Sequence, residues 1–90
     1  MKRFHLLIKG RVQMVGFRYF TRKKAQELGV NGWIKNLPDG DVEAVIEGED
    51  SAVEQLIKYC KRGPLFADVT NIEIQERRYS KEFKQFEIHY

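Results

Sequence analysis

The strongest constraint on the fold of this chain is the run Gly10-Arg11-Val12-Gln13-Met14-Val15-Gly16-Phe17-Arg18, which joins a strand pattern to a helix pattern. Before the run, apolar side chains alternate along residues 4–9 with the two-residue period of a half-buried strand. After it, spacings of three and four residues predict one buried helical face, formed by Phe17, Thr21, Ala25 and Leu28. The run is therefore a loop that ends at a helix N-terminus.

A loop in this position is suited to hold an anion. Unpaired backbone N–H groups and a partial positive charge project from a helix N-terminus. Arg18, in the first turn, adds a planar fork of donors that matches phosphate oxygens two at a time. Strand-to-helix turns with glycine are nevertheless common, and an arginine in a first turn is often only a solvated surface residue. By itself, the loop leaves both interpretations open.

The segment from Gly32 to Glu43 predicts a β-hairpin. Pro38-Asp39-Gly40 supplies a fixed φ, a local side-chain hydrogen bond and a position of positive φ, which a tight reversal between two strands requires. Asn36 lies just before this turn, near the end of the incoming strand, where a short amide side chain extends past the edge of the sheet.

The remaining pattern completes the order strand, helix, strand, strand, helix, strand, with a short final strand. Gly29 is placed to end the first helix, and Ser51-Ala52-Val53-Glu54 predicts a capping box that opens the second. Apolar alternation marks the later strands at Val42, Ala44 and Ile46, at Ile72 and Ile74, and at Phe86, Ile88 and Tyr90, the last reached through a charged linker from Glu76 to Glu82.

This order of elements predicts the α+β class, as a ferredoxin-like two-layer sandwich. We expect a βαββαβ core with a short extra C-terminal strand, and an antiparallel sheet with two helices on one face. The strand ending at Gly10 and the strand ending near Asn36 then run parallel and finish at one edge, with the hairpin's return strand between them. They lie two strand spacings apart, about 10 Å. The first helix starts at the same edge, so the loop, Arg18 and Asn36 are expected to converge.

Two motifs in the right order and separation resemble one family. The run from Gly10 to Arg18 is similar to the acylphosphatase signature G-R-V-Q-G-V-x-F-R, and the segment from Gly32 to Glu43 resembles that family's G-W-x-x-N-x-x-D-G-x-V-E. Further on, Gly63-Pro64 with Ala67 and Val69, and the ending Phe86-Glu87-Ile88, also resemble the family. The likeness extends over nearly the whole chain.

The resemblance implies a hydrolase that cleaves the carboxyl-phosphate mixed anhydride of acyl phosphates to a carboxylate and inorganic phosphate. It implies Arg18 and Asn36 as catalytic residues and a phosphate-binding backbone cradle formed by Gln13, Met14, Val15, Gly16, Phe17 and Arg18. No cofactor and no metal are implied. Inorganic phosphate or sulfate is expected to compete with the small-molecule substrate.

The residue inventory independently favours mixed anhydrides over esters. The first motif holds no His, Asp or Glu, and the carboxamide of Asn36 is not a base, although it can hold a water in line for attack. The carboxylate that leaves an acyl phosphate has a conjugate acid of pKa about 4, so it departs without a general acid. An alkyl phosphate would instead expel a strongly basic alkoxide.

Met14 departs from the family signature, which has Gly at that position. The Met backbone still offers its N–H. If the position needs a left-handed backbone, however, a side chain there costs about 1 to 2 kcal/mol of strain. We expect a weakened or reshaped cradle rather than an abolished one.

Length and composition predict one domain over residues 1–90. No apolar stretch approaches the ~20 residues that cross a bilayer, and we expect a cytoplasmic monomer without a membrane or nucleic-acid partner. The lone Cys60 falls on the buried stripe of the second helix and is expected to pack in the core. We expect structural roles for His5, His89 and Trp33. For Arg11, the sequence does not decide between a solvated side chain and a supporting electrostatic role.

Two other classes of function remain as alternatives. The net charge of +3 and the sandwich fold are compatible with RNA binding, but the strand Val42–Gly48 lacks the aromatic residues that stack bases and carries two acids. The basic run Arg22-Lys23-Lys24 covers only about one helical turn. A catalytically silent anion sensor would use the same cradle, and an acyl phosphate release assay separates it from an enzyme.

Overall fold

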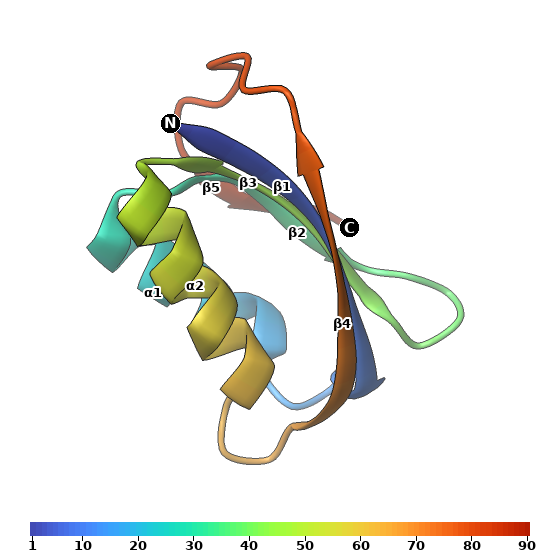
Figure 1. Cartoon of the computed structure of the whole chain (residues 1–90). Helices are drawn as coiled ribbons and strands as arrows, with labels where there is room; N and C mark the ends of the chain where they lie inside the picture. Colours follow the sequence, from blue (N-terminus) through green and yellow to red (C-terminus); the bar gives the residue numbers. More distant parts are fainter.

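The computed structural model describes all residues, 1–90. Its elements in chain order are β1 (Lys2–Arg11), α1 (Phe17–Leu28), β2 (Asn31–Asn36), β3 (Val42–Gly48), α2 (Asp50–Arg62), β4 (Asp68–Arg77) and β5 (Phe86–Ile88). The two helices lie together on one side of the sheet (Figure 1). Neither helix combines the length and the apolar character that crossing a bilayer requires.

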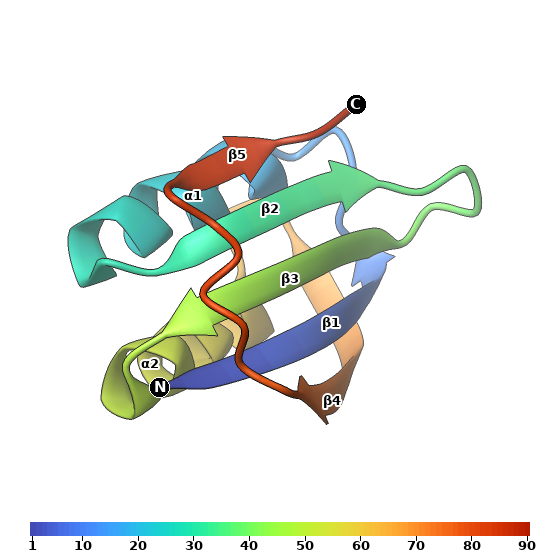
Figure 2. The ribbon, with the colours of Figure 1, turned by 90° about the horizontal axis from the view of Figure 1, so that it is seen from above.

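The strands form one sheet in the order β4-β1-β3-β2-β5 (Figure 2). The first four strands pair antiparallel, whereas β5 pairs parallel with β2 along the edge. The predicted ferredoxin-like sandwich is confirmed, and the added strand makes the sheet mixed rather than purely antiparallel. β5 is parallel because residues 78–85 carry the chain from the end of β4 across the sheet to the start of β2 (Figure 2).

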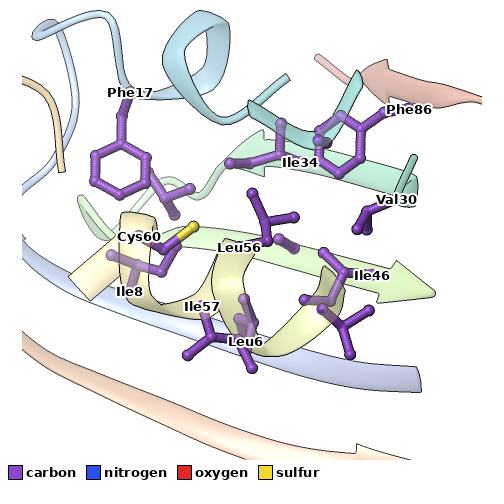
Figure 3. Close-up of a cluster of buried hydrophobic side chains, with 14 of the residues drawn as sticks. Leu6, Ile8, Phe17, Val30, Ile34, Ile46, Leu56, Ile57, Cys60 and Phe86 are labelled. Atoms are coloured by element: carbon purple, nitrogen blue, oxygen red, sulfur yellow. The ribbon is translucent and has the colours of Figure 1, made fainter. Parts of the chain in front are cut away.

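One cluster of apolar side chains fills the space between the sheet and the helices (Figure 3). The alternation predicted for the strands places Leu6 and Ile8 of β1 and Ile34 of β2 in this cluster, each fully buried. Cys60 of α2 also packs there, as predicted. Burial raises the pKa of its thiol to about 12, so Cys60 is a core residue rather than a nucleophile.

The end of α1 matches its sequence prediction, whereas the start of α2 does not. Gly29 ends α1 in the left-handed conformation, with φ 73°, as its position predicted. The capping box predicted at Ser51-Ala52-Val53-Glu54 is wrong: Glu49 is the N-cap of α2, and no side chain caps the helix. The Glu49 carbonyl already accepts the N–H of Val53 at 3.0 Å, so the helix begins two residues earlier than the capping box implies, and Ser51 lies exposed in its first turn.

The predicted charged linker also starts later than expected. Residues Glu76 and Arg77 belong to β4, because they pair with Phe4 and Arg3 of β1. The connecting segment therefore runs over residues 78–85, and it crosses the sheet face that the helices leave open (Figure 2).

Glu47 anchors this connecting segment. It lies on the open face of β3, yet only 3% of its surface is exposed. Its carboxylate accepts hydrogen bonds from the backbone N–H groups of Ser80 (3.1 Å) and Glu82 (3.0 Å) and from the guanidinium of Arg3 (3.2 Å). Burial by itself raises the pKa of Glu47, but these donors outweigh it, and the pKa lies below the ordinary value of 4.5.

We predict that Glu47→Gln lowers the free energy of unfolding by about 1–3 kcal/mol, because the buried donors lose a charged acceptor. The depressed pKa means that the stabilisation is complete above the unfolded-state value of 4.5 and is lost as the pH falls through the folded-state pKa. Urea unfolding over a pH series measures both effects. Glu76→Gln, at an exposed position, is the control. Equal acid sensitivity of the wild type and Glu47→Gln would contradict the anchoring role.

Candidate active site

The ends of β1 and β2 meet at one edge of the sheet. Both strands pair antiparallel with β3, which lies between them, so they run in the same direction. Residues 12–16 connect the end of β1 to α1, and Asn36 is the last residue of β2. The predicted convergence of the two motifs is thus confirmed at the level of the strands.

A hollow of about 180 Å³ lies where these segments meet, lined by Val12, Met14, Gly16, Phe17, Arg18, Tyr19 and Asn36. It brings together both predicted catalytic residues, Arg18 and Asn36. Of the other predicted cradle residues, Met14, Gly16 and Phe17 line the hollow, whereas Gln13 and Val15 do not border it.

Gln13 instead ties the loop to the hairpin through its side chain. Its amide nitrogen donates to the backbone carbonyls of Leu37 (2.7 Å) and Asp41 (2.9 Å), which flank the turn after Asn36. Sequence reasoning expected only a backbone role for Gln13 and missed this contact. This contact ties the loop to Leu37, the residue that follows Asn36. It therefore holds the loop and Asn36 at a fixed separation.

We predict that Gln13→Ala lowers the free energy of unfolding by about 1–2 kcal/mol, since two hydrogen bonds between loop and hairpin are lost. Urea unfolding measures the change. The control is Gln26→Ala at an exposed position of α1, which is expected to stay within about 0.5 kcal/mol of the wild type. If both variants unfold like the wild type, Gln13 does not hold the loop in place.

The N-terminus of α1 opens toward the hollow without a cap. Gly16 is the N-cap residue with φ 77°, no side chain caps the helix, and its first turn contains no acidic residue. The N–H groups of Phe17, Arg18 and Tyr19 form no backbone hydrogen bond. These free donors and the positive end of the helix dipole favour a negatively charged group beside them.

Arg18 is held beside two aromatic residues. Its guanidinium lies over the ring of Tyr90, 5.1 Å from the centroid. A hydrogen bond with Tyr19 raises the pKa of Tyr90. Sequence reasoning placed Tyr90 only in a strand pattern and did not single out Tyr19. The sequence could have indicated Tyr19, because it follows Arg18 in the first helical turn. No pattern near Tyr90 in the sequence indicated a place beside Arg18.

Asn36 presents a free acceptor. Its Oδ1 atom is buried and accepts no hydrogen bond from the protein. The hairpin turn has the predicted chemistry, because the Asp39 carboxylate accepts the N–H of Asp41 at 2.9 Å and Gly40 has φ 98°. A buried acceptor without a partner is costly in a stable fold and is typical of functional positions.

Met14 has the left-handed backbone that the sequence analysis considered. Its φ is 60°, and its side chain is fully exposed. A non-glycine residue in this conformation carries about 1 to 2 kcal/mol of strain. The loop therefore keeps its shape with a side chain where glycine would be free of strain.

The other residues that the sequence analysis singled out lie away from the hollow. His5 faces the open side of the sheet and pairs with Glu43 at 2.7 Å. The ring of Trp33 stacks on that of His89, with centroids 5.3 Å apart. Arg11 is exposed at the end of β1 and does not line the hollow. These positions match the structural interpretation of the two histidines and the tryptophan.

The topology and this hollow define the class of ferredoxin-like α+β sandwiches in which a strand-to-helix loop and a hairpin end face one another. The family model described as Acylphosphatase matches residues 4–88. The chain is 47% identical over 88 residues to an acylphosphatase of Methylococcus capsulatus, which covers 98% of this chain and 96% of that protein.

Two further comparisons agree. An acylphosphatase of Syntrophus aciditrophicus is 49% identical over 90 residues, covering 100% of this chain and 94% of that protein. The crystal structure of acylphosphatase from Bacillus subtilis superposes with a TM-score of 0.96 at 38% identity, covering 100% of both chains. This chain belongs to the acylphosphatase family, and it is an enzyme of the hydrolase class.

Proposed function

We propose that this enzyme, which hydrolyses acyl phosphates, does so in the hollow between residues 12–19 and Asn36. The backbone N–H groups of the cradle and the guanidinium of Arg18 hold the phosphoryl group. Asn36 orients the attacking water. The observation that carries this proposal is the meeting in one hollow of an uncapped helix N-terminus, Arg18 and an amide acceptor free of protein partners.

Phosphoryl transfer places growing negative charge on the oxygens around phosphorus. Donors that are already in position lower the energy of that charge without any reorganisation at the moment of reaction. The free N–H groups at the start of α1 and the two-pronged guanidinium meet this requirement. The guanidinium of Arg18 also lies over the ring of Tyr90, and this cation–π contact favours that position of the side chain.

The side-chain amide of Asn36 hydrogen-bonds the attacking water, so that a lone pair of the water is directed at phosphorus. A carboxamide takes no proton, so the water's proton passes to a phosphate oxygen of the substrate. The carboxylate leaving group has a conjugate acid of pKa about 4 and departs unprotonated. The reaction therefore requires no ionisable side chain as acid or base, and none lines the hollow except Arg18 and Tyr19.

A release assay tests the proposal. Purified protein is expected to accelerate phosphate release from benzoyl phosphate well above the spontaneous rate, and to leave an alkyl phosphate untouched. A chelator is expected to have no effect, which checks the prediction that no metal takes part. Inorganic phosphate and sulfate are expected to inhibit competitively. Binding of phosphate without turnover would instead identify an anion sensor.

We also propose that residues 1–90 act as a single, monomeric domain in the cytoplasm, with no nucleic-acid partner. One continuous apolar cluster supports the single domain. The absence of aromatic residues on β3 speaks against base stacking. Sedimentation equilibrium measures the molar mass in solution. A molar mass that rises above that of one chain as the protein concentration increases would contradict the monomer.

A further inference from the structure

Met14 is an exposed apolar side chain on a strained backbone at the border of the hollow. Its side chain is 100% exposed, and its φ of 60° is a conformation that glycine adopts without strain. The side chain adds nothing to the core and forms no hydrogen bond, so folding stability does not account for it. Because Met14 lines the hollow, its exposed side chain is available to a ligand bound there.

Exposed apolar side chains border this hollow. Exposed large apolar side chains occur at only seven positions of the chain. Met14 and Tyr19 line the hollow, and Tyr90 lies against Arg18. The hollow therefore combines a polar side, formed by Arg18 and Asn36, with an apolar rim.

An acyl phosphate has the same two parts, and in-line attack decides how they lie. Water attacks phosphorus on the side opposite the leaving carboxylate. Asn36 orients that water in the proposed mechanism, so the acyl group extends away from Asn36, toward the other residues that line the hollow. Met14 is one of these residues, and its side chain is fully exposed. The acyl group consequently comes to lie along the rim.

We propose that Met14 is a specificity-determining residue, which contacts the acyl group of the substrate and favours large apolar acyl groups over small ones. The inference rests on the proposed function of the hollow. Apolar contact between the thioether chain and an aromatic acyl group removes area of both from water, whereas an acetyl group offers far less apolar area for such a contact. Through this contact with the acyl group, Met14 raises kcat/KM for substrates with large apolar acyl groups. The contacts to the phosphoryl group stay unchanged.

The test compares benzoyl phosphate with acetyl phosphate in the wild type and three variants. Met14→Gly removes the side chain and the strain. Met14→Asn keeps a side chain that tolerates a left-handed backbone but is polar. Met14→Leu keeps an apolar side chain and the strain. The ratio of kcat/KM for benzoyl phosphate to that for acetyl phosphate is expected to fall about three- to tenfold in the Gly and Asn variants and to stay near the wild-type value in Met14→Leu.

The inhibition constant of inorganic phosphate is a second measurement, since a change in cradle shape alters phosphate binding without altering that ratio. Leu65→Ala is the control, because Leu65 is 89% exposed on another loop and does not line the hollow. An unchanged ratio in Met14→Gly and Met14→Asn overturns the inference, even if both substrates react more slowly. Failure of the wild type to hydrolyse either acyl phosphate overturns the proposed function itself.

Discussion

Arg18→Ala is expected to lose about 10³-fold in kcat/KM for benzoyl phosphate, with a rise of at least about tenfold in the inhibition constant of inorganic phosphate. Arg18 is the only cationic side chain that lines the hollow, and in the proposed mechanism its donors act on the bound phosphoryl group as well as on the transition state. Losing them therefore weakens binding and slows turnover together. Initial-rate kinetics with phosphate as competitive inhibitor measure both quantities.

The control for Arg18 is Lys23→Ala, which removes one positive charge from the same helix at an exposed position. It is expected to keep kcat/KM within about twofold, because an exposed charge outside the hollow is screened by salt. Arg18→Lys separates charge from geometry, since an ammonium cannot form the two-pronged contact. Full activity in Arg18→Lys would show that charge alone is sufficient. Full activity in Arg18→Ala would end the proposed mechanism.

Asn36→Ala is expected to lower kcat for benzoyl phosphate about 10²-fold and to change the inhibition constant of phosphate less than about threefold. The amide holds the attacking water in the proposed mechanism and makes little contact with the bound phosphoryl group. Its loss leaves the anion contacts in place and removes only the orientation of the nucleophile. Rates at saturating substrate, together with phosphate inhibition, measure this separation of turnover from binding.

Asn71→Ala is the matched control for Asn36, because Asn71 is exposed on β4 and lies outside the hollow. Asn36→Asp adds a sharper test, since a carboxylate in the hollow repels the phosphoryl group and is expected to weaken phosphate binding as well as turnover. Normal turnover by Asn36→Ala would refute the role of Asn36 in orienting water. The hollow would then require another group to position the nucleophile.

Much of the fold was predictable because its signals are local. The alternation along β1 and the spacing of Phe17, Thr21 and Ala25 follow directly from the periods of a strand and a helix. Gly29 and Gly40 occupy positions where the backbone needs positive φ. The order of elements then placed the ends of β1 and β2 at one edge, so the meeting of Arg18 with Asn36 was predictable as well.

The errors occurred where a local motif competed with contacts that the motif does not contain. Ser51 and Glu54 match a capping box, but α2 begins earlier, and Asp50 at its start pairs with the N-terminal amine of Met1 at 2.9 Å. Likewise, Glu76 and Arg77 look like linker residues by charge. They extend β4 because β1 offers backbone partners beside them.

By itself, the sequence determined the order of the elements, the position of the loop at a helix N-terminus and the family. Only the tertiary structure decided that Gln13 joins the loop to the hairpin, that Tyr90 lies against Arg18, and that Glu47 is buried. Each of these features depends on residues that lie far apart in the chain and meet only in the folded structure. Propensity and periodicity act over a few neighbouring residues, whereas such contacts depend on how the whole chain packs.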